Sequence, residues 1–277
     1  MMTWTLEKYN KDHSPAIKNL IREDEFVRRD ILGCLEEFPE YAMIVRSDGF
    51  IAAICVYTGI SEKTSFTLYV HPDYRSQGIG SLLLSSLEKE MAEKGVKEIV
   101  CDYKVDDSIR GFLSRKGYEK WFRSRHMIFS GTLLSPQNPS VSAYVDSDYL
   151  HVQKIFSESF HRMRLHVGIS STLSAPSEEE RSYFLKHAED IFVLRDNSEI
   201  VAVAMVEGNE IDKIAVAVDE QGKGYGKTLL AYTVGTLLHR GFSEVTLWVV
   251  DGNPARMLYE HFGFRMHRLH EFVQKKL

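Results

Sequence analysis

Cysteine is scarce in this chain of 277 residues, which holds three: Cys34, Cys55 and Cys101. All lie in the first half and their spacing fits no metal motif, which favours reduced, buried thiols over a disulfide framework. No apolar stretch approaches the roughly 20 residues that cross a bilayer. The charged N-terminus also lacks the apolar run of a signal peptide. We therefore expect a soluble, cytoplasmic protein with no membrane partner.

An excess of positive charge is also absent, since the formal net charge is −5. This charge argues against a general nucleic-acid binder. It is compatible with a cationic substrate, although the need for solubility alone would explain the negative charge. His161 and His166 are five residues apart, so they do not share a helix face as a metal pair would. We expect no metal. At about 150 residues per domain, the length favours two domains.

One stretch, residues 210–230, organises the second half. It reads as a buried strand, a glycine-rich turn (QGKGYG, residues 221–226) and an amphipathic helix. The free N–H groups at a helix N-terminus suit a phosphate. A Walker A loop ending at Lys227 would need glycine in place of Gln221, and a dinucleotide fingerprint would need glycine at 227. A phosphate-binding nucleotide hydrolase is therefore the least favoured interpretation of this turn.

The turn occurs twice in the same register. Gly78 and Gly224 are 146 residues apart (224 − 78), and three further glycine pairs keep this separation: Gly80 and Gly226, Gly95 and Gly241, Gly117 and Gly263. A shared separation over forty residues indicates a duplicated domain. We expect domains at 1–130 and 144–277, joined by a linker at 131–143 that is rich in Ser, Pro and Asn.

Each copy is expected to run strand–helix–helix–strand–strand–strand–helix–strand–helix–strand. This order predicts an α/β (α+β) fold with a mixed, mostly antiparallel sheet flanked by helices. The offset between the copies grows from 135 (Tyr9 to Tyr144) to 149 (Arg46 to Arg195), so the second copy has about fourteen extra residues (149 − 135) around 161–180. They either reshape specificity or form a tolerated surface loop.

The turn and a second segment, residues 253–264 (NPARMLYEHFGF), resemble the GNAT family of acyl-CoA-dependent N-acyltransferases. In that segment Ala255, Tyr259, Gly263 and Phe264 match the family pattern Asn-x-x-Ala-x-x-x-Tyr-x-x-x-Gly-Phe, whereas the asparagine position holds Gly252 and Asn253 is one place late. The resemblance implies two tandem GNAT folds that use acetyl-CoA as co-substrate.

The resemblance also implies roles for individual residues. Glu210, eleven residues before Gln221 (221 − 210), corresponds to the family's base, and Tyr259 to the acid that protonates the departing thiolate. Either could instead be structural, as a strand-end carboxylate and a packed helix aromatic. The expected acetyl-CoA contacts are Ile214, Ala215, Val216, Gln221, Gly222, Lys223, Gly224, Tyr225, Gly226, Lys227, Asn253 and Arg256.

The first copy departs from the family at these catalytic positions. Thr64 stands in the place of Glu210, Leu113 in that of Tyr259 and Asp107 in that of Asn253, so the acid and the base are missing. This copy either binds CoA without catalysis or is a structural support. A second CoA site would comprise Leu68, Val70, Arg75, Gln77, Gly78, Ile79 and Gly80.

The sequence predicts an acetyl-CoA-dependent N-acetyltransferase that acts on an amine of a small molecule or peptide, with the chemistry in the second copy. No serine or cysteine has a recognisable catalytic partner, which favours direct transfer over a covalent enzyme intermediate. Two alternatives stay open within this reading: a longer acyl donor, or an O-acyl acceptor. A rival of another class is a non-catalytic acyl-CoA-binding or regulatory protein. The sequence names neither the acceptor nor an oligomeric state.

Overall fold

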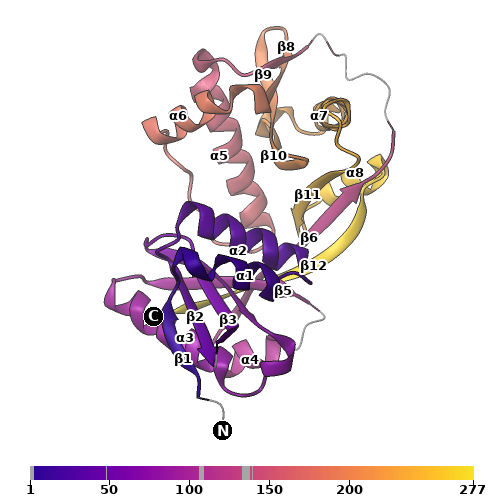
Figure 1. Cartoon of the computed structure of the whole chain (residues 1–277). Helices are drawn as coiled ribbons and strands as arrows, with labels where there is room; N and C mark the ends of the chain where they lie inside the picture. Colours follow the sequence, from indigo (N-terminus) through magenta and orange to yellow (C-terminus); the bar gives the residue numbers. More distant parts are fainter. Residues whose placement is uncertain (1–2, 48, 106–108, 133–137, 139) are drawn as a thin grey trace. The chain divides into compact units, whose positions relative to one another are not determined.

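The computed structural model describes residues 3–47, 49–105, 109–132, 138 and 140–277, which fall into two compact units (Figure 1). Unit 1 comprises Met1–Trp121 with Glu271–Leu277, and unit 2 comprises Phe122–His270. Asp107 and part of the expected linker, residues 133–137 and 139, lie outside the described residues.

Unit 1 is built on a sheet with the strand order β1-β2-β3-β4-β5-β12. Strands β1 to β4 pair antiparallel, and β4 pairs parallel with β5. One face of the sheet packs on α3 and the other on α1 and α2. The elements are β1 Thr5–Lys8, α1 Ser14–Leu20, α2 Glu25–Glu37, β2 Ala42–Ser47, β3 Phe50–Tyr57, β4 Lys63–Val70, α3 Ile79–Glu93, β5 Glu98–Lys104, α4 Ile109–Arg115 and β6 Glu119–Phe129.

Unit 2 repeats this plan with the strand order β12-β6-β11-β10-β9-β8-β7. Its elements are β7 Val141–Ala143, α5 Tyr149–His166, α6 Glu178–Lys186, β8 Ile191–Asp196, β9 Glu199–Glu207, β10 Glu210–Val216, α7 Tyr225–His239, β11 Val245–Val250, α8 Ala255–Phe262 and β12 Arg265–Lys276. The fold class and the order of elements expected from the sequence are confirmed in both units. The segment expected as a linker includes β7, which pairs with β8.

The two copies exchange parts of their last strands, which the sequence analysis does not anticipate. Residues 124–129 of β6 pair antiparallel with β11 in unit 2. The end of β12 belongs to unit 1, where the Leu277 amide donates to the Lys97 carbonyl at 3.0 Å. Glu271 is 1% exposed there, accepts a hydrogen bond from the Tyr103 hydroxyl and lies 3.5 Å from Arg110 Nε. Unit 1 is therefore made of two separate stretches of chain, whereas unit 2 is one continuous stretch, residues 122–270.

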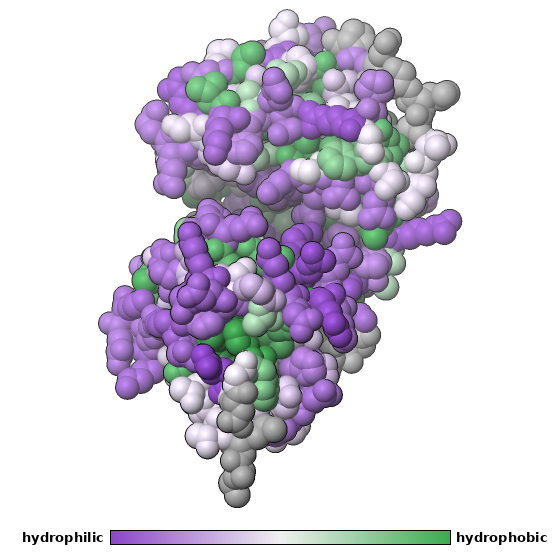
Figure 2. Space-filling model, in the orientation of Figure 1, coloured by the Kyte–Doolittle hydropathy of each residue, from purple (hydrophilic) through white to green (hydrophobic). Residues whose placement is uncertain are grey.

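Among the described residues, no helix is long and apolar enough to cross a membrane. Hydrophilic side chains cover most of the visible face of each unit, with smaller hydrophobic patches between them (Figure 2).

A cluster of charged side chains around the half-buried Glu90 ties β1 to α3 in unit 1 and gives a pH-dependent prediction. Glu90 accepts hydrogen bonds from Lys8 Nζ at 2.7 Å, Lys94 Nζ at 2.8 Å and the Tyr57 hydroxyl at 2.9 Å. Burial by itself would raise the pKa of Glu90, but these donors outweigh it and lower the pKa from 4.5 to about 2. A depressed pKa stabilises the fold above pH 4.5, and this stabilisation is lost as the pH falls toward 2.

We expect Glu90→Gln to lower the free energy of unfolding at pH 7 by about 1–2 kcal/mol, after allowance for partial solvent screening. The same variant should flatten the pH dependence of unfolding between pH 4.5 and 2. Urea unfolding at several pH values measures both effects. Glu93→Gln, on the same helix and 66% exposed, is the control and should behave as the parent protein. A Glu90→Gln protein as acid-sensitive as the parent would contradict the prediction.

Candidate functional site

The parallel ladder between β10 and β11 opens after two residue pairs. Glu210 lies opposite Thr246 and Ile211 opposite Leu247, and no further pair joins the two strands although both continue. From Ile211 to Val216 the unpaired edge of β10 spans about 17 Å, at about 3.3 Å per residue. Such an edge offers backbone N–H and C=O groups along the length of an extended arm that carries amides.

The glycine-rich turn stands at the far end of this edge. Gly224 is the N-cap of α7 with φ 92°, in the left-handed region that favours glycine, and its carbonyl accepts from the amides of Lys227 and Thr228. Across residues 222–226, all within the described part of the chain, the amide N–H groups have no intramolecular acceptor. The turn thus presents consecutive free donors at a positive helix end, which fits a pyrophosphate.

The Gln221 side chain joins this turn to the end of the preceding strand. Its Nε2 donates to the Val216 carbonyl at 3.2 Å, and in unit 1 Arg75 Nε donates to the equivalent Val70 carbonyl at 3.0 Å. Both side chains therefore fix the turn to the last residue of the preceding strand. Binding of CoA by Gln221 and Arg75 stays a prediction. The hydrogen bonds that these two side chains make in the structure hold the turn in shape.

Helix α8 brings Tyr259 to the same place. A Cβ at Gly226 would lie 3.4 Å from Val216 Cγ2 and 3.6 Å from Leu258 Cδ2, so the turn, the end of β10 and α8 converge. Tyr259 is 7% exposed and belongs to the apolar cluster that also contains Ile211. Its hydroxyl has no hydrogen-bond partner among the described residues and is not one of the fully enclosed unpaired polar atoms. Burial raises the pKa of Tyr259 to about 12, which keeps the phenol protonated.

Glu210 occupies the closed end of the opened ladder, at its first residue pair. It is half-buried and precedes a register irregularity of β10 between Ile211 and Lys213. Because neighbouring residues in a strand point to opposite faces, Glu210 faces away from the cluster that contains Ile211 and Tyr259. The two predicted catalytic residues therefore belong to opposite faces of the sheet, at the position where the strands part.

Helix α5 covers the second face of the opened strands. Its Ser159 hydroxyl donates to the Val216 carbonyl at 2.8 Å, at the end of β10. Just beyond the helix, Val167 Cγ1 would lie 3.4 Å from a Cβ at Gly252, in the turn after β11. Sequence reasoning missed Ser159 and Val167, because a contact over 57 residues leaves no local signal.

The extra residues of the second copy lengthen α5 and form the segment that returns along it. The helix runs to His166 and so includes the first of the extra residues. The segment between α5 and α6, residues 167–177, is held against α5 at Ser174. The Ser174 carbonyl accepts from Gln153 Nε2 at 2.8 Å, and the Ser174 amide donates to Ser157 Oγ at 2.9 Å.

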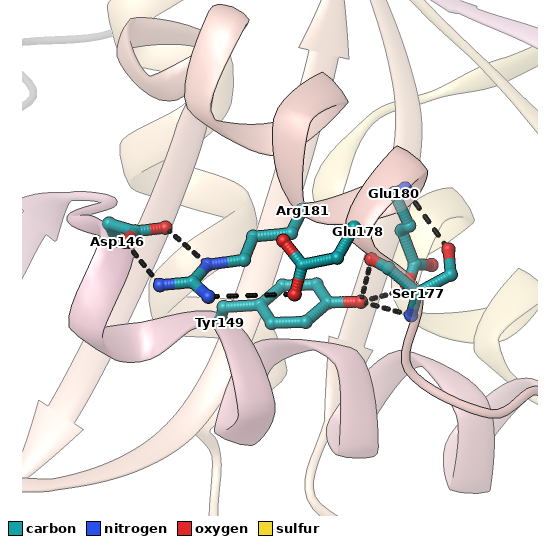
Figure 3. Close-up of polar contacts among 6 residues, drawn as sticks. All are labelled: Asp146, Tyr149, Ser177, Glu178, Glu180 and Arg181. Atoms are coloured by element: carbon teal, nitrogen blue, oxygen red, sulfur yellow. Dashed lines mark hydrogen bonds and ion pairs between the residues drawn. The ribbon is translucent and has the colours of Figure 1, made fainter.

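Polar contacts hold the start of α6 against α5 (Figure 3). The Tyr149 hydroxyl donates to the Ser177 carbonyl at 2.8 Å and accepts from the Ser177 amide at 2.7 Å. Arg181 makes two hydrogen bonds to Asp146, at 2.9 and 2.6 Å, and lies 3.7 Å from Glu178. The extra segment is therefore fixed to the body of unit 2 at both ends.

Four other predicted residues have partners of their own. Asn253 Oδ1 accepts from the Ala255 amide at 2.9 Å and so caps the start of α8. Arg256 pairs with Glu260 at 3.2 Å, and Lys223 with Glu220 at 2.9 Å. The Tyr225 hydroxyl donates to Asp196 at 2.5 Å, and this hydrogen bond raises the pKa of Tyr225 to about 12. Ile214 and Val216 pack on the Tyr259 side of the sheet and Ala215 on the α5 side.

Unit 1 keeps the opened ladder and the turn. Its pairing between β4 and β5 ends at Ser65 and Val100, and Gly78 is the left-handed N-cap of α3. Leu113, 3% exposed, takes the place of Tyr259 in the core. Unit 1 thus retains the opened ladder and the capped turn without the phenol. In neither unit do the described residues bring three histidine, cysteine or acidic side chains together as a metal would require.

Two family models match the chain in tandem. The acetyltransferase (GNAT) family model covers residues 152–264, and the acetyltransferase (GNAT) domain model covers residues 39–120. Mycothiol acetyltransferase of Renibacterium salmoninarum is 24% identical over 235 residues, which are 77% of this chain and 68% of that protein.

Solved structures share the fold over the whole chain. A GCN5-related N-acetyltransferase from Sphaerobacter thermophilus superposes with a TM-score of 0.79 at 20% identity, covering 99% of this chain and 95% of that one. A tandem GNAT protein from the clavulanic acid biosynthesis pathway gives a TM-score of 0.70 at 14% identity, covering 100% and 98%. With two family domains in tandem, this chain belongs to the GNAT acetyltransferase family and is a GNAT-type acyltransferase.

Proposed function

We propose that this protein transfers the acetyl group of acetyl-CoA to an amine of a small molecule or peptide, and that unit 2 carries out the chemistry. The observation that carries the proposal is the Tyr259 hydroxyl, which is protonated and has no hydrogen-bond partner among the described residues. Tyr259 packs in one apolar cluster with Ile211 of the opened ladder, and unit 1 has Leu113 at this position. The relative named mycothiol acetyltransferase supports acetyl transfer as the reaction.

The turn and the strand edge would hold the co-substrate. The amides of residues 222–226 would bind the pyrophosphate, and the unpaired edge of β10 would bind the amides of the pantetheine arm. An arm along this edge leads from the turn to the closed end of the ladder, where Glu210 stands. Fixing the thioester at that end turns a bimolecular reaction into one between bound groups.

Glu210 and Tyr259 would handle the two protons of the transfer. Glu210 accepts a proton from the amine, through a water molecule, so that the nitrogen can bond to the acyl carbon. Tyr259 donates its proton to the sulfur as the carbon–sulfur bond breaks, so that a thiol leaves instead of a thiolate. Because the two residues belong to opposite faces of the sheet, the amine would approach from the α5 side.

The face covered by α5 is therefore the proposed acceptor side, and the extra segment around 161–180 would form part of its wall. Its fastening at Ser174, Ser177 and Arg181 gives it a defined position. A wall on a fixed segment can select acceptors by shape, which a mobile loop does less well. For unit 1 we propose a site that can hold acyl-CoA without catalysis.

The proposed function is tested by incubating the whole protein with acetyl-CoA and a broad panel of amines, followed by mass spectrometry of the products. We expect at least one acetylated amine, formed together with an equal amount of free CoA. Glu210→Gln should lower turnover most at low pH, where less of the amine is already deprotonated. A protein that binds acetyl-CoA but acetylates no amine would contradict the proposal and favour the acyl-CoA-binding alternative.

A further inference from the structure

Unit 1 contains a cavity of about 300 Å³ that is separate from the turn at residues 75–80. This volume is at the lower end of the range for small-molecule sites. The cavity lies on the α1 side of the sheet, where β4 ends and β3 begins. It is lined by Ala16, Asn19, Leu20, Arg22, Glu23, Gly49, Phe50, Ile51, Tyr69, His71 and Tyr74.

One wall of the cavity is a packed set of aromatic rings. The rings of Phe50 and Tyr74 stack with centroids 4.8 Å apart. Trp4 packs edge-on against both, at 6.1 and 5.6 Å, and His71 lies 5.4 Å from Tyr74. Because these rings pack against one another, they form a rigid aromatic surface. Such a surface suits a planar apolar ligand.

Tyr69 contributes a polar group that the fold leaves unused. Its side chain is 8% exposed and lines the cavity, yet its hydroxyl has no hydrogen-bond partner among the described residues and is not fully enclosed. Buried phenols usually find a partner. Burial raises the pKa of Tyr69, so the hydroxyl stays a donor at neutral pH. A ligand in the cavity would supply the missing acceptor.

The rim carries both signs of charge. Arg22 and Glu23 are 68% and 69% exposed, and their charged atoms lie 4.0 Å apart, which is a weak surface pair. Both side chains can therefore turn toward a ligand at little cost. A guanidinium beside a carboxylate matches a molecule that has a carboxylate and an ammonium group.

Unit 2 has different side chains at the equivalent positions. Tyr69 pairs with Ile54 across the sheet, and the matching pair in unit 2 is Ala215 with Val203. Ala217 stands at the position of His71 (71 + 146), and Phe160 of α5 packs in the same cluster. The lining of this cavity is therefore particular to unit 1 and is not repeated in the second copy of the fold.

We propose that this cavity is a binding site for a small zwitterion with a flat apolar ring, of the chemical class of the aromatic amino acids. The ring lies against Phe50 and Tyr74, an acceptor group of the ligand meets the Tyr69 hydroxyl, and the charged head reaches Arg22 and Glu23. The site does not depend on the proposed acetyl transfer, since it lies in the other unit from Glu210 and Tyr259.

The test is isothermal titration of L-phenylalanine into the whole protein without acetyl-CoA. Phenethylamine and 3-phenylpropionate, which each lack one charge, are the comparison ligands. We expect L-phenylalanine to bind at least about tenfold more tightly than either, and Tyr69→Phe to weaken its binding about three- to tenfold. Ala16→Trp, which fills the cavity from α1, should abolish binding, and Lys18→Trp on the same helix but outside the cavity should not.

Each result decides the proposal. Binding that survives in Ala16→Trp, or that is lost equally in Lys18→Trp, would show that the cavity is not the site. Equal affinity for phenethylamine would exclude a zwitterion. Failure of L-phenylalanine to bind at millimolar concentration would also overturn the proposal. Because no acetyl-CoA is present, none of these results depends on whether unit 2 acetylates an amine.

Discussion

Tyr259→Phe is expected to lower kcat for acetyl transfer between about 10- and 100-fold, while acetyl-CoA affinity changes less than about twofold. The substitution removes one hydroxyl and keeps the ring that packs in the core of unit 2. Because that hydroxyl has no partner among the described residues, its loss leaves no donor or acceptor unsatisfied and should leave the free energy of unfolding unchanged. The lower kcat should therefore reflect the loss of the group that protonates the leaving sulfur.

Two comparisons separate this role from a general disturbance. Tyr232→Phe makes the same chemical change at another tyrosine that packs on this cluster, and it should leave kcat unchanged. A general acid must be protonated, and burial raises the pKa of Tyr259 to about 12, so the parent protein should show no loss of kcat from this group up to about pH 10. Steady-state kinetics over pH 6–10 measure both. A Tyr259→Phe protein with parental kcat would remove Tyr259 from the mechanism.

The features that the sequence predicted well are those with a local steric cause. Gly224 and Gly78 both cap a helix in the left-handed conformation, at φ 92° and 86°. Gly226 and Gly80 both lie where a side chain would meet the preceding strand and the next helix. The left-handed backbone restricts Gly224 and Gly78 to glycine, which accounts for the separation of 146 that this pair keeps. The duplicated turn could therefore be recognised without a structure.

The features that the sequence did not predict depend on distant partners. The pattern of β6 and β12 is that of a half-buried strand, and it is the same whether the strand completes its own unit or the other. The bond from Ser159 to Val216 and the contact of Val167 with Gly252 likewise join residues that are far apart in sequence. The side-chain oxygen of Asn253 caps α8, a contact that was not predicted, and the contact of Asn253 with acetyl-CoA stays a prediction.

A matched pair of glycine variants should show which unit binds and uses acetyl-CoA. Gly226→Val is expected to weaken acetyl-CoA binding in unit 2 at least about tenfold and to lower turnover with it. The Cβ itself fits, at 3.4 Å from Val216 and 3.6 Å from Leu258. The two added methyl groups, however, would occupy the space between the turn and the unpaired edge of β10, where the pyrophosphate and the start of the pantetheine arm are proposed to bind.

Gly80→Val places the same side chain in the same surroundings of unit 1, where a Cβ would lie 3.5 Å from Phe112 and 3.7 Å from Val70. The cost to stability should therefore be similar in both variants, at about 1 kcal/mol or less for valine in the first turn of a helix. Titration with acetyl-CoA gives the number of sites, and steady-state turnover gives the activity. If catalysis resides in unit 2, Gly80→Val keeps full turnover and removes at most a second binding site. Because the two substitutions are matched in geometry, turnover lost in Gly80→Val and kept in Gly226→Val would assign catalysis to unit 1.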